Sequence, residues 1–217
     1  KHDPLAPHWP DRDRFILSKG HACPVLYGAL ALKGYFDFDV IHTLRSEGSI
    51  LQGHPDMKKC PGVDISTGSL GQGLSCGVGM AIAGKRDKLP YRVFVMIGDG
   101  EAQEGQIWEA AQTANKYGLD NLVVIVDDNG LQCDGCCDEI MPTGDLGRKF
   151  DAFGFEVFSI DGHDMSQILA AFDLIRSRSG NGRPKCIMAK TRKGRGVSFM
   201  EDVAEWHGMA PDDEQFA

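Results

Sequence analysis

Two polar turns carry the side chains best suited to chemistry. The first is Gly98-Asp99-Gly100, and the second is Asp127-Asp128-Asn129. The Asp99 carboxylate, the Asn129 amide oxygen and a main-chain carbonyl just beyond, at Leu131, are all oxygen donors, a set that suits Mg²⁺ or Ca²⁺ and not zinc or copper. The glycines beside Asp99 let the backbone approach a ligand closely. A diphosphate bridged by the metal is the ligand expected there.

Each turn follows an unbroken apolar run, at residues 93–97 and 122–126, which predicts two strands covered on both faces. The apolar and small residues between them recur at helical spacing: Ile107, Ala110, Ala111, Ala114 and Gly118. A strand, helix, strand unit makes the strands parallel, so their ends meet at one edge, about 5 Å apart if they are neighbours. The helix would also point free N–H groups at the ligand. An isolated Gly-Asp-Gly is more simply a tight turn, but Asn129, one crossover away, favours the metal site.

These turns carry a family resemblance. Gly98-Asp99-Gly100 followed at this distance by Asn129 resembles the thiamine diphosphate signature, and GDGEAQEGQIWEA with DDNGLQCDG is similar to transketolases. The resemblance implies that Asp99, Asn129 and the Leu131 carbonyl hold magnesium on the diphosphate of the cofactor. It also implies that the Gly100 amide contacts a phosphate and that Cys133 lies near the thiazolium ring.

Three histidines take candidate roles from the same resemblance. His21 lies in LSKGHA, which in the family lines the cofactor and substrate channel, and His54 lies in a GHP segment expected to bind the donor sugar. His207, in WHG, resembles the family histidine that returns to the diphosphate and exchanges protons with the substrate. Judged without the resemblance, His21 would be a helix cap or surface residue, His54 an exposed loop residue and His207 a solvent-facing residue.

Two further segments resemble the family. The run GSLGQG is similar to its GPLGQG, which implies that the Gly68 carbonyl and the Leu70 amide meet the aminopyrimidine ring, with Ser69 where proline is usual. Glu104 and Glu109 match interface glutamates that link paired active sites, and Glu104 is thereby also a candidate cofactor contact. A capping or salt-bridged carboxylate near a positive helix end is the alternative for both.

The rest of the chain predicts an α/β domain with a mostly parallel sheet and helices on both faces, of the thiamine diphosphate-binding type. Further strands are expected at residues 156–160 and 185–189, each ending in a polar turn. His163, after the third strand, either supports the diphosphate or stabilises its turn. The opening fifteen residues are expected to form a connecting segment. Helices are expected after His21, with Val25, Leu26, Ala29, Leu30 and Leu32 inward, at 41–45, at 74–83, and at 165–178, with Ile168, Leu169, Phe172 and Ile175 inward.

Composition limits the classes of partner. A chain of 217 residues with 42% hydrophobic content is expected to form one domain over its whole length. A formal charge of −8 argues against nucleic acid or an anionic membrane, and no apolar run approaches the length of a membrane span. Seven cysteines, an odd number, predict a reducing compartment, the cytoplasm. Cys133 and Cys136 form a CxxC, but no second pair completes a four-ligand zinc site.

The ends of the sequence bear on the predicted partners. Because the chain begins at Lys1 without methionine, and because the family's SGHPGG run with a further histidine is absent, we expect that the true N-terminus is missing. The family places its cofactor between this domain and a pyrimidine-binding domain that supplies an activating glutamate. We expect that second domain on a separate C-terminal subunit, within a dimer or heterotetramer.

The resemblance thus implies an N-terminal subunit of a split transketolase, which transfers a two-carbon ketol unit from a ketose phosphate to an aldose phosphate with thiamine diphosphate and magnesium. A related enzyme with another donor is an alternative, for example one like deoxyxylulose phosphate synthase or one using a sulfo or branched sugar. A non-catalytic, cofactor-binding regulatory subunit is another. A dinucleotide-binding dehydrogenase is disfavoured, because no G-x-G-x-x-G opens a helix after a strand.

Overall fold

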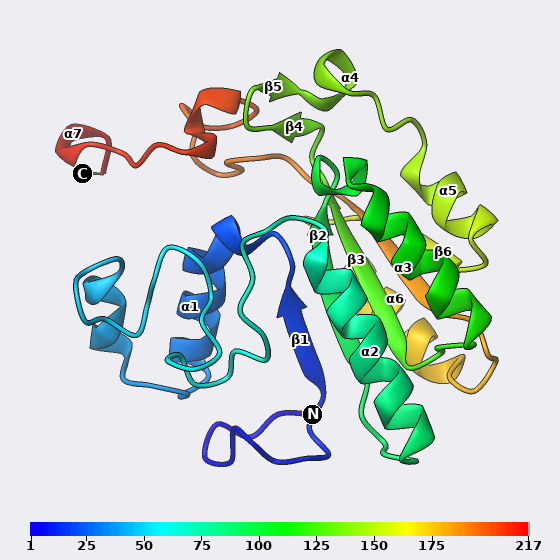
Figure 1. Ribbon diagram of the computed structural model, residues 1–217. Helices are drawn as coiled ribbons and strands as arrows, with labels where there is room; N and C mark the ends of the chain where they lie inside the picture. Colours follow the sequence, from blue (N-terminus) through cyan, green and yellow to red (C-terminus); the bar gives the residue numbers. More distant parts are fainter. Residues whose placement is uncertain (217) are drawn as a thin grey trace.

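A parallel five-stranded sheet forms the centre of the protein (Figure 1). The computed structural model describes residues 1–216. The strands lie in the order β1-β2-β3-β7-β6, and every neighbouring pair is parallel. Their bounds are Arg14–Leu17 for β1, Val93–Gly98 for β2, Leu122–Asp128 for β3, Glu156–Asp161 for β6 and Lys185–Lys190 for β7. The predicted mostly parallel α/β sheet is confirmed.

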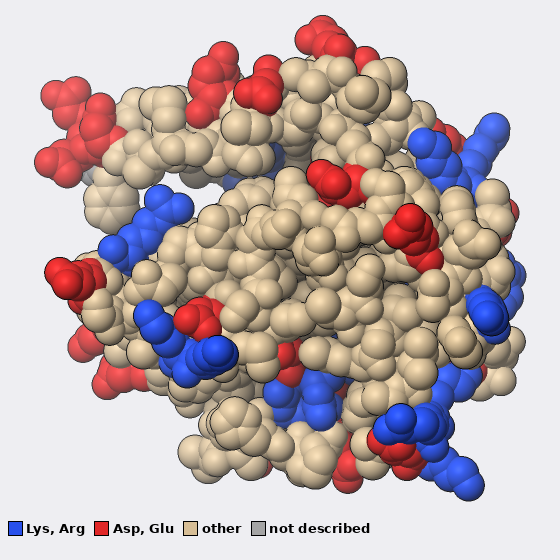
Figure 2. Space-filling model, viewed as in Figure 1, with Lys and Arg blue, Asp and Glu red and all other residues tan. Residues whose placement is uncertain are grey.

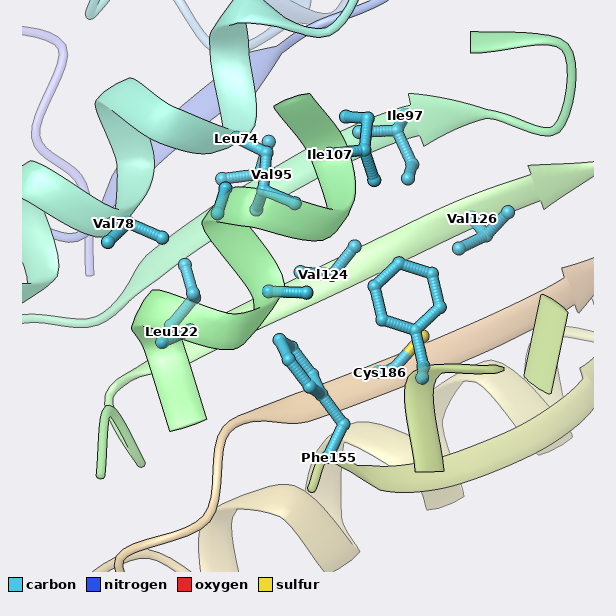
Figure 3. Packing of buried hydrophobic residues seen from close by; sticks show 14 of the residues in the cluster. Leu74, Val78, Val95, Ile97, Ile107, Leu122, Val124, Val126, Phe155 and Cys186 are labelled. Carbon is cyan, nitrogen blue, oxygen red and sulfur yellow. The ribbon is translucent and has the colours of Figure 1, made fainter. Parts of the chain in front are cut away.

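Helices cover both faces of this sheet, as predicted. In Figure 1, α2 (Gln72–Arg86) and α3 (Gly105–Lys116) lie in front of the sheet, and α6 (Met165–Ser177) lies behind it. The front core joins these two helices and α5 (Leu146–Ala152) to the inward side chains of the strands. Figure 3 shows Leu74 and Val78 of α2 and Ile107 of α3 packed over β2 and β3. Burial of this apolar surface is the main stabilisation of the fold.

Helix α2 packs very closely on the sheet because of its glycines. A Cβ at Gly77 would lie 2.4 Å from Val95 Cγ2, and one at Gly73 would lie 2.4 Å from Ser18 Oγ. Gly79, on the outer side of the same helix, has nothing within 4 Å. Helix α2 corresponds to the helix predicted at 74–83 and is longer by two residues at its start and three at its end.

A smaller core forms around α1 (Cys23–Leu32) and the loops that follow it. Tyr27 and Leu30 face this core, whereas Val25 and Leu32 are 70% and 76% exposed and Ala29 is also exposed, so the prediction that these three point inward is wrong. Every residue of α1 is uncharged, so its sequence gives no amphipathic phase from which an inner face could be assigned.

The remaining elements are short. They are the 3-10 segments Gly20–Ala22, Phe38–Thr43, Glu101–Gln103 and Ala204–His207, the hairpin strands β4 (Leu131–Gln132) and β5 (Gly135–Cys136), and the helices α4 (Cys137–Ile140) and α7 (Asp213–Phe216). The helix expected at 41–45 is the 3-10 segment Phe38–Thr43, shifted towards the N-terminus. Leu169 of α6 is 60% exposed, so its predicted inward position is wrong. Among the described residues, none of the helices is long and apolar enough to cross a membrane.

Charged side chains are unevenly distributed on the surface. On the face seen in Figure 2, the area in front of α2 carries almost none, and Lys, Arg, Asp and Glu lie mostly around its edge. The exposed residues of α2 in this region include Gln72, Ser75 and Gly79. A broad uncharged face of this kind is suited to contact with another protein surface.

Candidate functional site

The site lies at the carboxyl edge of the sheet, where the turns after β2 and β3 meet. The strand register pairs Gly98 with Asp127, and the Asp99 main-chain N–H donates to the Asp127 carbonyl at 3.2 Å. The two turns predicted to be neighbours are therefore in direct contact. Asp99 does not lead directly into the helix, because the 3-10 segment Glu101–Gln103 intervenes and α3 begins only at Gly105.

The Asp99 carboxylate is 4% exposed and lies between the two turns. Its Oδ1 accepts from the Gly100 N–H at 2.7 Å, and its Oδ2 accepts from the Gly130 N–H at 2.5 Å. Burial raises the pKa of Asp99, and the two N–H donors only partly offset this effect. A divalent cation at this carboxylate would favour its ionised form.

Asn129 and Leu131 complete the predicted oxygen set beside Asp99. The Asn129 Oδ1 accepts from the Leu131 N–H at 2.9 Å, and its amide donates to Asp127 Oδ2 at 3.3 Å. Within residues 1–216, no three His, Cys, Asp or Glu side chains are grouped to hold a metal. A cation here would therefore bind one carboxylate together with amide, main-chain and ligand oxygens. That chemistry fits Mg²⁺ carrying a diphosphate.

A cavity of about 210 Å³ opens at these turns. Most residues that the sequence singled out line it: His21, Leu70, Asp99, Gly100, Glu104, Asn129, Leu131, Cys133 and His207. Lys19, Glu101 and Lys193 also line it, and the sequence motifs did not point to them. A larger cavity of about 450 Å³ adjoins it between α6 and the sheet, with Met96, Ile125 and Phe172 among its walls. That second cavity is mainly apolar.

Two lysines, Lys19 and Lys193, bring positive charge to the small cavity beside its carboxylates. Lys19 forms an ion pair with Asp127, whose other carboxylate oxygen accepts from the Thr191 hydroxyl. Burial alone would raise the pKa of Asp127, but Lys19 and the hydrogen bonds outweigh it, so that pKa is lowered. Burial and the charge of Lys19 lower the pKa of Lys193. An anionic ligand would relieve the repulsion between the two lysines.

His21 and His207 come together although they lie at opposite ends of the sequence. Their ring centroids are 4.9 Å apart, and Lys193 Nζ lies 3.1 Å from His207 Nδ1. Burial, followed by His207 and the two lysines, lowers the pKa of His21 to about 4. Burial and then Lys193 lower the pKa of His207. Both imidazoles are thus held neutral at pH 7 and can accept a proton.

His54 and Gly68 lie against each other beside this cavity and not in its lining. Gly68 has a φ of +152°, and a Cβ there would be 3.1 Å from the His54 ring. The loop that carries His54 is attached to α1, because the carbonyls of Gln52 and His54 lie 2.9 and 3.0 Å from the Tyr27 hydroxyl and share its one proton.

Cys133 lies in the turn of the β4–β5 hairpin and is exposed. The hairpin packs over the first turn, since a Cβ at Gly100 would be 3.0 Å from Gln132 Cβ. Gln103 Nε2 donates to Gln132 Oε1 at 2.5 Å and holds the hairpin in place. Burial raises the pKa of Cys137 to about 12, so this thiol is protonated and inert.

The structure bears on alternatives that the sequence left open for Glu104 and His163. Glu104 occupies the N-cap position of α3, yet among the described residues its side chain accepts no capping hydrogen bond, and both Glu104 and Glu109 are exposed. The capping alternative therefore does not hold for Glu104. His163 Nε2 accepts from the Arg192 N–H at 2.7 Å, which joins the turns after β6 and β7 and gives it a role in the turn.

A parallel sheet with helices on both faces and polar turns along one edge is the arrangement of α/β domains that bind their ligand at the carboxyl ends of the strands. The family model described as "Transketolase, thiamine diphosphate binding domain" matches residues 1–217. The chain belongs to this family. The resemblance drawn from its motifs is confirmed.

Known relatives and structures agree. The chain is 47% identical over 216 residues to the 6-deoxy-6-sulfo-D-fructose transketolase subunit SqwG of Clostridium sp. (strain MSTE9), covering 100% of this chain and 78% of that protein. It is 45% identical to one of the subunits of the apulose-4-phosphate transketolase of Phocaeicola vulgatus, covering 96% and 75%. The crystal structure of Campylobacter jejuni transketolase superposes with a TM-score of 0.88 at 34% identity, over 94% of this chain and 33% of that one. The predicted class, a transferase subunit of the transketolase type, is confirmed at this level.

Proposed function

We propose that this chain is the diphosphate-binding subunit of a two-subunit transketolase that moves a two-carbon ketol unit from a ketose phosphate to an aldose phosphate. The observation that carries the proposal is the convergence of Asp99 and Asn129 with the His21 and His207 pair at one cavity. Asp99, Asn129 and the Leu131 carbonyl would hold Mg²⁺, and the Gly100 amide would contact a phosphate. The main chain at Gly68 and Leu70 would face the aminopyrimidine.

Thiamine diphosphate, when bound, supplies an electron sink for the transferred unit. The residues of this chain contribute charge and proton handling. Lys19 and Lys193 would offset the charge of the diphosphate, and Cys133, in the turn of the β4–β5 hairpin, would lie near the thiazolium ring. His21 and His207, neutral in the free protein, accept and return protons at the hydroxyls of the sugar, while His54 orients its carbonyl end.

A partner protein completes the proposed site. The activating glutamate belongs to the pyrimidine-binding domain, which we place on a C-terminal partner, because SqwG and the apulose-4-phosphate relative are both named as subunits. The uncharged face in front of α2 (Figure 2) is the surface we assign to self-association into a dimer or heterotetramer. The exposed Glu104 and Glu109 belong to the start of the neighbouring helix α3, and we assign them to the same interface. We assign the assembly to the cytoplasm.

The sugar donor is open to a direct assay. The names of the two relatives contain a sulfosugar and a branched sugar phosphate, so a sulfonated or branched ketose is the second candidate beside an ordinary ketose phosphate. Purified chain and C-terminal partner would be tested with ketose phosphates, 6-deoxy-6-sulfofructose, apulose 4-phosphate and pyruvate. Turnover with a ketose and loss of turnover in Asp99→Asn support the proposal. Turnover with pyruvate would indicate chemistry like that of deoxyxylulose phosphate synthase, and cofactor binding without turnover would indicate a regulatory role.

A further inference from the structure

Glu101 is a buried carboxylate to which the proposed chemistry gives no role. It is 3% exposed, and it directly follows the Gly98-Asp99-Gly100 turn. A carboxylate buried to this extent needs hydrogen-bond donors. Three are present: the Ser18 hydroxyl and the Gly71 N–H, the latter at 2.8 Å, both donate to Oε1, and the Gly98 N–H donates to Oε2 at 3.2 Å.

The three donors come from three separate segments of the site. Ser18 directly follows β1 and leads to Lys19 and His21. Gly71 ends the loop that carries residues 68–70, and Gly98 is the last residue of β2, next to Asp99. One side chain therefore links the loop assigned to the aminopyrimidine, the turn assigned to the metal and diphosphate, and the strand that leads to the histidine.

Besides the hydrogen bond to Glu101, two further features restrict the loop before α2. Gly71 has a φ of +84°, and a Cβ there would lie 2.9 Å from Glu104 Cβ. Gln106 Nε2 donates to the Leu70 carbonyl at 3.1 Å, which provides a second attachment to α3. The loop thus sits between the Glu101 carboxylate and the first turn of α3, and its distance from Asp99 depends on both contacts.

We propose that Glu101 is a positioning residue that sets the spacing between the main-chain contacts of residues 68–70 and the Asp99 turn. A ligand that spans both parts would bind tightly only when this spacing is correct, whereas a ligand that reaches only the Asp99 turn would not depend on it. The inference rests on the proposed function, because it takes thiamine diphosphate as the spanning ligand.

The test compares two ligands in Glu101→Gln, a change that keeps the side-chain shape but replaces one acceptor oxygen with a donor. Calorimetry on the full-length protein would measure Mg²⁺ with thiamine diphosphate and Mg²⁺ with inorganic pyrophosphate. We expect roughly a 10- to 100-fold loss for thiamine diphosphate, the range for a hydrogen bond to a charged group, and a change below about threefold for pyrophosphate. Equal losses for both ligands, or no loss, would overturn the proposal.

Controls separate this inference from the proposed function. Glu47→Gln makes the same chemical change at an exposed turn and is expected to leave both affinities unchanged. If Glu101→Gln fails to fold, Ser18→Ala is the second variant, because it removes one of the three donors. It should lower the ratio of the affinity for thiamine diphosphate to the affinity for pyrophosphate by about three- to tenfold. An unshifted ratio there would equally refute the positioning role. A wild-type protein that binds no thiamine diphosphate would refute the proposed function. Amide hydrogen exchange at Gly71 would then still test the positioning role, because exchange should be faster in both variants if Glu101 holds the loop.

Discussion

The Asp99 carboxylate accepts a hydrogen bond from the Gly130 main-chain N–H at 2.5 Å. This contact joins the turn after β2 to the turn after β3, so the two strand ends form one rigid unit before any ligand arrives. Preorganised oxygen atoms of this kind favour a cation because little rearrangement is needed on binding.

Asp99→Asn tests the metal site. The amide keeps the size of the side chain but removes its charge. We therefore expect Mg²⁺-dependent binding of thiamine diphosphate to weaken by about 100-fold or more, because residues that only support a metal ligand already contribute roughly 10- to 100-fold. Isothermal titration calorimetry would measure it. Asp128→Asn is the matched control, because Asp128 lies at the same edge but pairs with Lys190, at 3.5 Å. Equal losses in both variants would contradict the assignment of Asp99.

The His21 imidazole predicts a pH dependence of stability. Its pKa in the folded protein is about 4, below the ordinary 6.5, mainly because of burial and then because of His207 and the lysines. Between these two pH values the unfolded chain binds a proton that folded His21 does not, so the free energy of unfolding falls as the pH is lowered from 6.5 to 4. Urea unfolding at about pH 7 and pH 5 would show the decrease, and His21→Gln should reduce it. The same decrease in the variant would assign the effect to other groups.

Two glycines of α2 should respond in opposite ways to alanine. Gly77→Ala places a methyl group 2.4 Å from Val95 Cγ2, so we expect a loss of about 1–3 kcal/mol in the free energy of unfolding. Gly79→Ala meets nothing within 4 Å and should stabilise the helix by about 0.5–1 kcal/mol. Chemical denaturation of both variants measures the difference. Similar effects at the two positions would mean that α2 does not pack as closely as described.

The Tyr27 hydroxyl is expected to support the loop of His54. Tyr27→Phe leaves the Gln52 and His54 carbonyls without this donor, so we expect a loss of about 1–3 kcal/mol in stability and a raised KM for the ketose donor. Tyr117→Phe, at a side chain that is 52% exposed, should change stability by less than about 0.5 kcal/mol. A Tyr27→Phe enzyme with unchanged KM would remove His54 from the donor site.

The central strands were predictable because each is a long apolar run. The runs at 93–97 and 122–126 are covered on both faces of a parallel sheet, and such strands have a strong sequence signal. Strand β1 was not predicted, because it has only four residues and the first two, Arg14 and Phe15, end a charged segment that has the composition of a connection. The inner face of α1 could not be assigned, because its residues are apolar or small on all sides and the sequence does not distinguish a buried face from an exposed one. Which side is buried depends on the loops that pack against it, and these have no regular spacing of apolar residues.

The candidate site was predictable where a motif carries the contact. Asp99, Asn129 and the two paired histidines fall in such motifs, and they line one cavity. Glu101 and Lys19 were not predicted although each lies within a quoted motif, because a carboxylate or ammonium beside a glycine is ordinarily a solvated residue. Their roles depend on Gly71 and Asp127, partners that are distant in sequence and become visible only when the chain is folded.

The strand order has a consequence for how the chain is made. β7, the last strand of the sheet to be synthesised, inserts between β3 and β6, which both precede it. Until residues 185–190 leave the ribosome, β6 has no neighbour in the sheet and the outer edge of β3 stays open to pairing with other chains. Nascent forms of this protein that stop before β7 are therefore expected to depend on chaperones and to be prone to aggregation.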